Sequence, residues 1–423
     1  MRQYIESEQI VIESGDGFEL IDTRGKRYID GFSSLWCNLH GHRVPQIDAA
    51  VRDQLGRVAH STLLGLASVP SIELAARLAG AMPPSMAELT KTFFSDSGAS
   101  AVEVALKMAF QYYRNIGQAK RRRFIALRDG YHGDTLGAVS VGGVEAFHKL
   151  FGPLLFEATF VDTPNAYYNP AGADGTLEQI DRALAAHAGE YCAVILEPLI
   201  QAAGGMLTHP AGFLRKLREL TRRHDVLLIA DEVATGFCRT GRLFACEHEG
   251  VGPDMLCLGK GLTGGYLPVA ATMTTPRIFD AFRGEPEEGR TFYHGHTFTG
   301  NALGCAAAMA SIDLIFSSGL LATLGDKVEL IGRHLRPLAD HPNVGDIRQC
   351  GMMVGIELVR DRAGKKPFAP SRGSAAAVCR EAVRRGLMIR PLEDIVVLMP
   401  APAMDSPTLE RMMNITVEAI RNT

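Results

Sequence analysis

The chain has 423 residues, of which 46% are hydrophobic and 22% are charged, and its formal net charge is −3. This length favours two domains over one small core. The nearly balanced charge gives no electrostatic basis for binding nucleic acid or an anionic membrane. The charged start "MRQYIESEQ" does not resemble a secretory signal, and no apolar run approaches the roughly 18 residues of a membrane span. We therefore expect a soluble cytoplasmic protein with neither kind of partner.

The eight cysteines are scattered and contain no C-x-x-C pair, which favours free thiols over disulfides or a zinc site. The two "HGH" stretches, at 40–42 and 294–296, have no carboxylate or cysteine companions, and we interpret them as loop histidines. The basic run "KRRR" at 120–123 is interpreted as a solvated helix end. The sequence predicts no metal site.

Taken in chain order, residues 10–31 predict two or three antiparallel strands around a "GDG" turn. Short apolar runs that predict strands then alternate with helical patterns such as that of residues 100–115. The predicted strands lie at 91–96, 124–129, 192–198, 226–232, 254–260 and 269–275. Because these runs are continuously apolar, they are typical of strands covered on both faces. The alternation predicts an α/β fold with a mainly parallel sheet.

The end of the chain has a different pattern. A helix-rich stretch after residue 312 leads to strand-like segments near 345–359 and 387–401, a helix at 374–386 and a last helix from Ser406. We expect this α+β tail to pack with the first strands as a small domain. The predicted division is an N-terminal segment at 1–50, a large domain at 51–311 and a small domain completed by 312–423.

Four features with chemical potential follow predicted strands, where ligands bind in open α/β sheets. The first is "FFSDSGASAVEV", in which small residues follow Asp96 and a long helix begins. Free backbone N–H groups at a helix start form an anion seat suited to phosphate. Ordinary capping of the helix by a serine is the alternative.

The second feature is "RDGYHGDT" at 128–135, in which Tyr131 lies between glycines and Asp134 is close in sequence. A tyrosine presented in this way offers its ring to a flat ligand. Simple packing of the ring is the alternative interpretation.

The third and fourth features are Asp231, at the end of the most apolar strand, and Lys260, 29 residues later after the next strand. A right-handed crossover keeps both strand ends at one edge of the sheet. The two side chains suit either a structural ion pair or the two ends of a bound pyridinium. No second carboxylate cluster accompanies Asp231, which disfavours a metal. The four features together favour pyridoxal phosphate (PLP), with Lys260 bonded to its aldehyde carbon.

At these residues the sequence resembles the class III, fold-type I PLP-dependent aminotransferases over nearly its whole length. The resemblance rests on "LLIADEVATGFCRTGRLFACEH", "PDMLCLGKGLTGG", "SDSGASAVEVALKMA" and "HGHTFTGNALGCAAA". Within that class, "DGFSSLWCNLHGH", "AHSTLLG", "RDGYHGDTLGAVSVGG" and "EPLIQAAGGM" resemble the 7,8-diaminononanoate synthases of biotin biosynthesis. The resemblance implies a large domain with a seven-stranded type of sheet, a small α+β domain, and a homodimer with active sites at its interface.

The reaction implied is transfer of an amino group to 8-amino-7-oxononanoate, with S-adenosylmethionine or lysine as donor. The resemblance implies that Lys260 binds the cofactor covalently and moves the proton, and that Asp231 keeps the pyridine nitrogen protonated. Gly98 and Ala99 are matched to the phosphate seat, and Thr297 to the phosphate of the neighbouring subunit's site. Tyr131 is expected over the cofactor ring.

The residues matched to the substrate pocket are Leu35, Trp36, Tyr131, Asp134, Gly295 and Arg390. Arg390 is expected to bind a carboxylate, because a guanidinium holds this group with two parallel hydrogen bonds. Gly295 is expected near the substrate of the neighbouring subunit. Glu197 and Arg239 also fall in matched motifs, and we expect supporting roles for them.

The sequence departs from the family pattern in three places. Leu35 stands where users of S-adenosylmethionine usually have a second tryptophan, which keeps lysine open as donor. Cys238 stands where glycine is common. The aromatic-containing segment that normally precedes the first strands is expected to be missing, or the recorded start to be too late. The alternatives are another class III aminotransferase, acting on ω-amino acids, acetylornithine or 4-aminobutyrate, and a non-catalytic binding protein of this fold.

Overall fold

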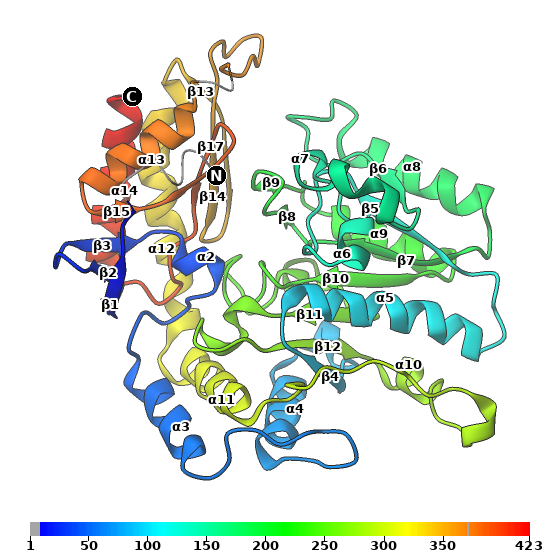
Figure 1. The fold of residues 1–423 in the computed structure, drawn as a ribbon. Helices are drawn as coiled ribbons and strands as arrows, with labels where there is room; N and C mark the ends of the chain where they lie inside the picture. Colours follow the sequence, from blue (N-terminus) through cyan, green and yellow to red (C-terminus); the bar gives the residue numbers. More distant parts are fainter. Residues whose placement is uncertain (1–8, 370–371) are drawn as a thin grey trace.

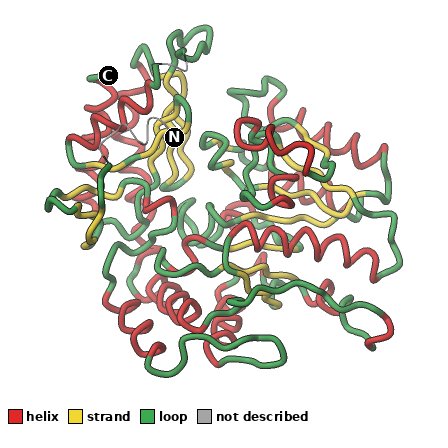
Figure 2. Tube along the Cα trace, in the orientation of Figure 1, coloured by secondary structure: helices red, strands yellow, loops and turns green. Residues whose placement is uncertain are grey.

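The computed structural model of the protein describes residues 9–369 and 372–423 (Figure 1). The expectation about a front segment concerns the start of the chain, and residues 1–8 lie outside the described part. Figure 2 shows two separate groups of strands, and the sequence colours of Figure 1 place one group in the middle of the chain and the other at its two ends. The α/β fold class predicted from the alternating pattern is therefore confirmed.

The larger sheet has seven strands in the order β4-β12-β11-β10-β7-β5-β6. Their bounds are β4 Lys91–Ser95, β5 Arg123–Leu127, β6 Thr159–Val161, β7 Tyr191–Leu196, β10 Leu227–Asp231, β11 Met255–Leu258 and β12 Ala270–Thr274. All six predicted strands are present, and only β12 runs antiparallel to its neighbours. β6 was not predicted, because a three-residue edge strand is too short to form an apolar run.

Both faces of this sheet are covered, as the continuous apolar runs predict. In β10, Leu227 and Ile229 belong to the hydrophobic cluster that contains α5 (Gly98–Asn115). Leu228 and Ala230 point the other way, into the cluster that contains α9 (Phe213–Arg223). Because side chains alternate along a strand, a core on each face leaves no polar position within it.

The smaller part contains two four-stranded sheets and comes from both ends of the chain, drawn in blue and in orange to red in Figure 1. The first sheet joins β1 (Ile12–Asp16), β2 (Glu19–Asp22) and β3 (Arg27–Asp30) to β15 (Leu387–Met388). The second has the order β13-β14-β17-β16, with bounds β13 Val344–Cys350, β14 Met353–Leu358, β16 Arg390–Leu392 and β17 Ile395–Leu398. The predicted antiparallel strands at 10–31 are confirmed.

Long helices occupy the positions at which the domain boundaries are predicted. The boundary after residue 50 falls within α3 (Pro45–Leu55), and the boundary after residue 311 falls within α11 (Ala302–Ser317). The tail continues with α12 (Leu320–Leu335), α13 (Ser374–Arg384) and α14 (Ser406–Arg421). We propose that α3 and α11 connect the two parts, and the division into domains stays a prediction.

The interpretation of "KRRR" as a solvated helix end is wrong for Arg121. Helix α5 ends at Asn115, and Arg121 is only 6% exposed. Its guanidinium donates to the Tyr191 carbonyl at 3.0 Å and to the Asp225 carboxylate at 3.1 Å. Acceptors brought by distant segments compensate the burial of the charge, and a run of basic letters does not reveal them.

Among the described residues, no single helix is long and apolar enough to cross a membrane. One pair, Ala302–Ser317 with Leu320–Asp340, meets the length and composition requirement only together and is bent by 75°. The eight cysteines are free. The described part of the chain contains no group of three or more His, Cys, Asp or Glu side chains that could hold a metal ion.

Candidate active site

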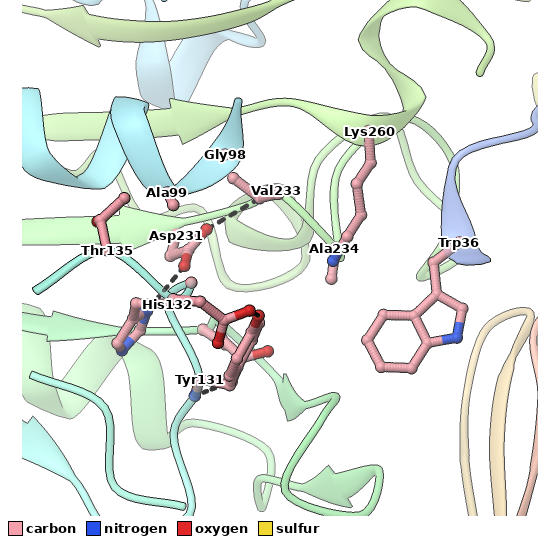
Figure 3. A pocket seen from close by; sticks show the side chains of 13 residues that line it. Trp36, Gly98, Ala99, Tyr131, His132, Thr135, Asp231, Val233, Ala234 and Lys260 are labelled. Atoms are coloured by element: carbon pink, nitrogen blue, oxygen red, sulfur yellow. Dashed lines mark hydrogen bonds and ion pairs between the residues drawn. The ribbon is translucent and has the colours of Figure 1, made fainter. Parts of the chain in front are cut away.

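The carboxyl ends of β10 and β11 form one edge of a cavity of about 380 Å³. The two strands are parallel neighbours, with Asp231 opposite Cys257. Lys260 follows β11 directly, at the start of the 3-10 helix η4 (Lys260–Thr263). Figure 3 shows the Asp231 and Lys260 side chains directed into the same space. The structure therefore brings together the two residues on which the sequence interpretation depends.

Asp231 is buried, and both of its oxygens are engaged. Its Oδ2 lies 2.7 Å from Nδ1 of His132, and its Oδ1 accepts the N–H of Val233 at 3.0 Å. Among the described residues it forms no ion pair with Lys260. The alternative of a structural pair between the two is therefore wrong, and His132 instead fixes the carboxylate.

Lys260 faces the cavity without a hydrogen-bond acceptor among the described residues. Its Nζ lies 4.8 Å from the centroid of the Trp36 ring, in a cation–π contact. Burial lowers the pKa of this amine, against the opposing effect of the Asp231 and Glu197 carboxylates. A partly desolvated lysine of lowered pKa is a better nucleophile, because more of it is unprotonated at neutral pH.

The start of α5 forms another wall of the cavity. Ser97 caps the helix by accepting the N–H of Ser100 at 3.2 Å, so the predicted serine cap is present. The N–H groups of Gly98 and Ala99 have no acceptor among the described residues. A Cβ at Gly98 would lie 2.5 Å from Cγ1 of Val233, so only glycine fits here. Capping and an open anion seat therefore coexist at this helix start.

The loop after β5 carries Tyr131. Its hydroxyl donates to Asp134 at 2.9 Å, and its backbone N–H donates to Glu197 at 3.0 Å. Burial raises the pKa of the tyrosine hydroxyl and raises the pKa of Glu197 to about 7. Glu197 also accepts the N–H of Ala202 at 2.9 Å. Both oxygens of Glu197 therefore accept backbone N–H groups and hold the loop in place.

Trp36 lies on the wall opposite, at the end of a tight turn (α2, Ser33–Trp36). All four residues of this turn have positive φ angles, between 48° and 72°. For residues other than glycine this costs roughly 1–2 kcal/mol each. The Trp36 ring is buried, whereas the neighbouring Leu35 is 49% exposed.

Arg239 is buried and bonds to the N-terminal and C-terminal segments at once. Its guanidinium donates to Ser33 Oγ at 3.1 Å, to the Asn38 carbonyl at 2.8 Å and to the Pro400 carbonyl at 2.9 Å. Burial lowers its pKa to about 10. Within the described part of the chain, this cation has only neutral oxygens at hydrogen-bond distance.

Several predicted site residues do not line this cavity. Leu35 and Arg390, the first residue of β16, are exposed, and the described residues provide no hydrogen bond or ion pair to the Arg390 guanidinium. Gly295 and Thr297 lie in an exposed segment beside α5, where Lys107 Nζ donates to the Tyr293 carbonyl at 3.0 Å. The expected roles of these four residues stay predictions.

Five residues that line the cavity were not predicted from the sequence: His132, Gly133, Thr135, Val233 and Ala234. His132 is adjacent to Tyr131 in "YHG", and Val233 follows Asp231 in "ADEVA". Their closeness in sequence to expected site residues was a usable signal. The contact between His132 and Asp231 joins residues 99 positions apart and could not be seen in the sequence.

Comparison with known proteins gives the family. The family model "Aminotransferase class-III" matches residues 3–420. The chain belongs to the class III aminotransferases. The aminotransferase is 52% identical to the adenosylmethionine-8-amino-7-oxononanoate aminotransferase of Nitratidesulfovibrio vulgaris, over 99% of this chain and 78% of that protein. It is 48% identical to the protein of the same name from Geobacter sulfurreducens, over 98% of this chain and 92% of that one.

Solved structures agree. The adenosylmethionine-8-amino-7-oxononanoate aminotransferase of Methanocaldococcus jannaschii has a TM-score of 0.95 and 41% identity, covering 100% of this chain and 95% of that one. A PLP-bound amine transaminase from an uncultivated Pseudomonas species has a TM-score of 0.92 and 35% identity, covering 98% and 94%. The predicted fold-type I architecture is therefore confirmed.

The residues of the cavity fit PLP, the cofactor of this class of enzyme. Asp231 is a fixed carboxylate for a protonated ring nitrogen, and the Lys260 amine, which has no hydrogen-bond acceptor in the described part of the chain, faces the same cavity. The N–H groups of Gly98 and Ala99 have no acceptor among the described residues and are open to an anion. The chain is a PLP-dependent aminotransferase.

Proposed function

We propose that this aminotransferase transfers an amino group to 8-amino-7-oxononanoate and forms 7,8-diaminononanoate, a step of biotin biosynthesis. The reaction class is carried by one observation, namely that Lys260 and Asp231 line one cavity without pairing. The substrate is supported by the shared name of relatives that are 41–52% identical over nearly the whole chain.

When bound, PLP supplies a carbonyl for the donor's amine and a ring that accepts electrons. Lys260 would hold it covalently until the donor's amine takes its place, and the released Nζ would then move a proton from the donor carbon to the cofactor. Asp231, held by His132, would keep the ring nitrogen protonated. The N–H groups of Gly98 and Ala99 would bind the phosphate. Gly98 and Ala99 begin α5, Asp231 ends β10, Lys260 follows β11, and His132 lies in the loop after β5.

For the acceptor we propose a pocket between Tyr131 with Asp134 and the wall formed by Leu35 and Trp36. Tyr131 would lie over the cofactor ring, with its hydroxyl held by Asp134 at 2.9 Å. Arg390 would bind the carboxylate of 8-amino-7-oxononanoate. Its exposure and its lack of a protein partner among the described residues are consistent with a guanidinium kept for a ligand.

We further propose a cytoplasmic homodimer in which Thr297 contacts the phosphate and Gly295 the substrate of the partner's site. The support is that both residues lie in an exposed segment outside their own cavity. The free cysteines of the chain suit a reducing compartment.

The deciding experiment supplies the purified, PLP-loaded enzyme with 8-amino-7-oxononanoate and one donor at a time. Mass spectrometry should detect the vicinal diamine with S-adenosylmethionine or with lysine. The matched control is Lys260→Ala, which should give none. Absence of the diamine with every donor, while simple amines are consumed, would reject the proposed acceptor and retain the aminotransferase.

The same donor panel decides the amino donor. Leu35 provides no flat face beside the single tryptophan Trp36, which weakens the stacking surface for an adenosyl group. A turnover with lysine at least equal to that with S-adenosylmethionine would identify lysine as the donor.

The runner-up is a class III enzyme that acts on other amines. It is favoured by the likeness to the Pseudomonas amine transaminase, whose identity of 35% is lower than the 52% of the Nitratidesulfovibrio vulgaris relative. Pyruvate as acceptor, with ω-amino acids, acetylornithine or 4-aminobutyrate as donors, tests this alternative.

A further inference from the structure

The turn that carries Trp36 is held in a backbone conformation that its residues do not favour. Ser33, Ser34, Leu35 and Trp36 have φ angles of 53°, 48°, 70° and 72°. Left-handed backbone is uncommon outside glycine, and four successive residues of this kind do not persist unless the surroundings impose them. Such strain is found where a side chain must be placed accurately.

One carboxylate makes several of the contacts that hold the turn in this conformation. Asp30, the last residue of β3, is 3% exposed and accepts the backbone N–H of Ser34 at 2.9 Å through Oδ1. Its Oδ2 accepts the Ser34 hydroxyl at 2.8 Å and lies 3.1 Å from Nε2 of His42. Hydrogen bonds to an ionised carboxylate are among the stronger ones in proteins.

The position of Asp30 is itself fixed by its strand. β3 pairs with β15, where Asp30 lies opposite Met388, and the Gly31 N–H donates to the Met388 carbonyl at 2.9 Å. A Cβ at Gly31 would lie 2.8 Å from Leu387 Cδ1, so the two strands are in close contact. The carboxylate is therefore attached to a rigid sheet.

The turn ends at the reactive amine. The Trp36 ring centroid lies 4.8 Å from Lys260 Nζ. Figure 3 shows the ring across the cavity from Asp231, beside the end of the lysine. A change in the turn moves this ring relative to the amine.

We propose that Asp30 is a positioning residue of the aminotransferase site, whose carboxylate holds residues 33–36 in the left-handed turn that keeps the Trp36 ring over the Lys260 amine. It acts through Ser34 and touches no reacting atom. This inference deepens the proposed function. Its kinetic test depends on that function, whereas its fluorescence test does not.

Trp36 is the only tryptophan of the chain, so its fluorescence reports the turn directly. In the PLP-loaded enzyme, access of acrylamide to the buried ring should rise at least threefold in Asp30→Asn. The amide cannot accept at both of its atoms, so Ser34 loses one partner. In the same variant kcat/KM should fall at least tenfold.

The matched control is Asp22→Asn in the same sheet. Asp22 is also buried and holds a turn, accepting the N–H groups of Arg24 and Lys26 at 2.9 Å each, but that turn carries no residue that lines the cavity, whereas the turn held by Asp30 carries Trp36. Acrylamide access and kcat/KM should stay within twofold of the wild type. Equal effects in Asp30→Asn and Asp22→Asn would overturn the proposal.

Rescue separates the placing of the turn from general stability. Asp30→Asn with Ser34→Gly should return acrylamide access to within twofold of the wild type, because glycine adopts positive φ freely. If Asp30→Asn does not fold, the comparison of Ser34→Ala with Ser34→Gly tests the proposal. Both variants lose the hydroxyl, but only glycine adopts the positive φ of the turn freely. Greater access in the alanine variant is expected, and equal access in the two would reject the inference. If these changes in fluorescence quenching do not occur, the positioning role of Asp30 is rejected. If no diamine is formed, the proposed acceptor is rejected instead.

Discussion

His132 and the Val233 N–H each engage one oxygen of Asp231, so the carboxylate has a single orientation. His132→Ala should leave that orientation free and lower kcat/KM about tenfold or more, which corresponds to at least about 1.4 kcal/mol of transition-state stabilisation. Steady-state kinetics in the diamine assay measure this. His187→Ala is the control, because this histidine follows α8 (Gly172–Ala186), is partly exposed and does not line the cavity. A loss below twofold in His132→Ala would contradict the role.

Two buried groups make opposite contributions to the pH dependence of stability. Burial raises the pKa of Glu232 from 4.5 to about 7, so the folded state binds more protons than the unfolded state between these values. The free energy of unfolding therefore falls as pH rises through this window, by up to about 1.4 kcal/mol per pH unit. Burial lowers the pKa of His209 from 6.5 to about 3, so its contribution is lost as pH falls from 6.5.

Single variants separate these contributions. Relative to Glu232→Gln, the wild type should lose stability from pH 4.5 to 7, and relative to His209→Phe it should gain stability from pH 3 to 6.5. Denaturant unfolding over this range measures both differences. Parallel curves for the wild type and Glu232→Gln would show that this carboxyl titrates normally.

At the scale of elements, the start of α5 is specified by one glycine. Gly98→Ala would place a Cβ 2.5 Å from Val233 Cγ1, and the affinity for PLP should fall at least tenfold as the helix start moves. Gly80→Ala is the matched control in helix α4 (Val69–Ala81), because a Cβ there meets nothing within 4 Å. Alanine at position 80 should leave PLP binding unchanged and stabilise the fold by up to about 1 kcal/mol. Titration with PLP, followed by absorbance, measures the affinity, and equal affinities in both variants would contradict the steric argument.

The elements also show how far a sequence predicts structure. The strands of the large sheet were found because burial on both faces requires continuous apolar runs, as in β10. β6 was missed because three residues at an edge carry no such pattern, and the burial of Arg121 was missed because its acceptors, Tyr191 and Asp225, are distant in sequence.

At the scale of the whole molecule, the proposed dimer predicts complementation between subunits. In a mixed dimer of Lys260→Ala and Thr297→Ala chains, one site has both changes and the other has neither, if Thr297 acts across the interface. Such dimers should recover about half of the wild-type activity in the diamine assay, while each variant alone is impaired. Refolding the two chains together and separately provides the comparison. No gain on mixing would place Thr297 in its own subunit's function or remove it from the site.

The sequence by itself determined the class of fold, the six main strands and the residues Asp231 and Lys260, because each is written in a local pattern or at a strand end. Only the tertiary structure decided that Asp231 binds His132 and forms no ion pair with Lys260 among the described residues, and that Asp30 holds the turn that carries Trp36. The first contact joins residues 99 positions apart, and the second depends on the pairing of β3, which ends at Asp30, with the distant strand β15. Neither the spacing nor the composition of the chain contains that information.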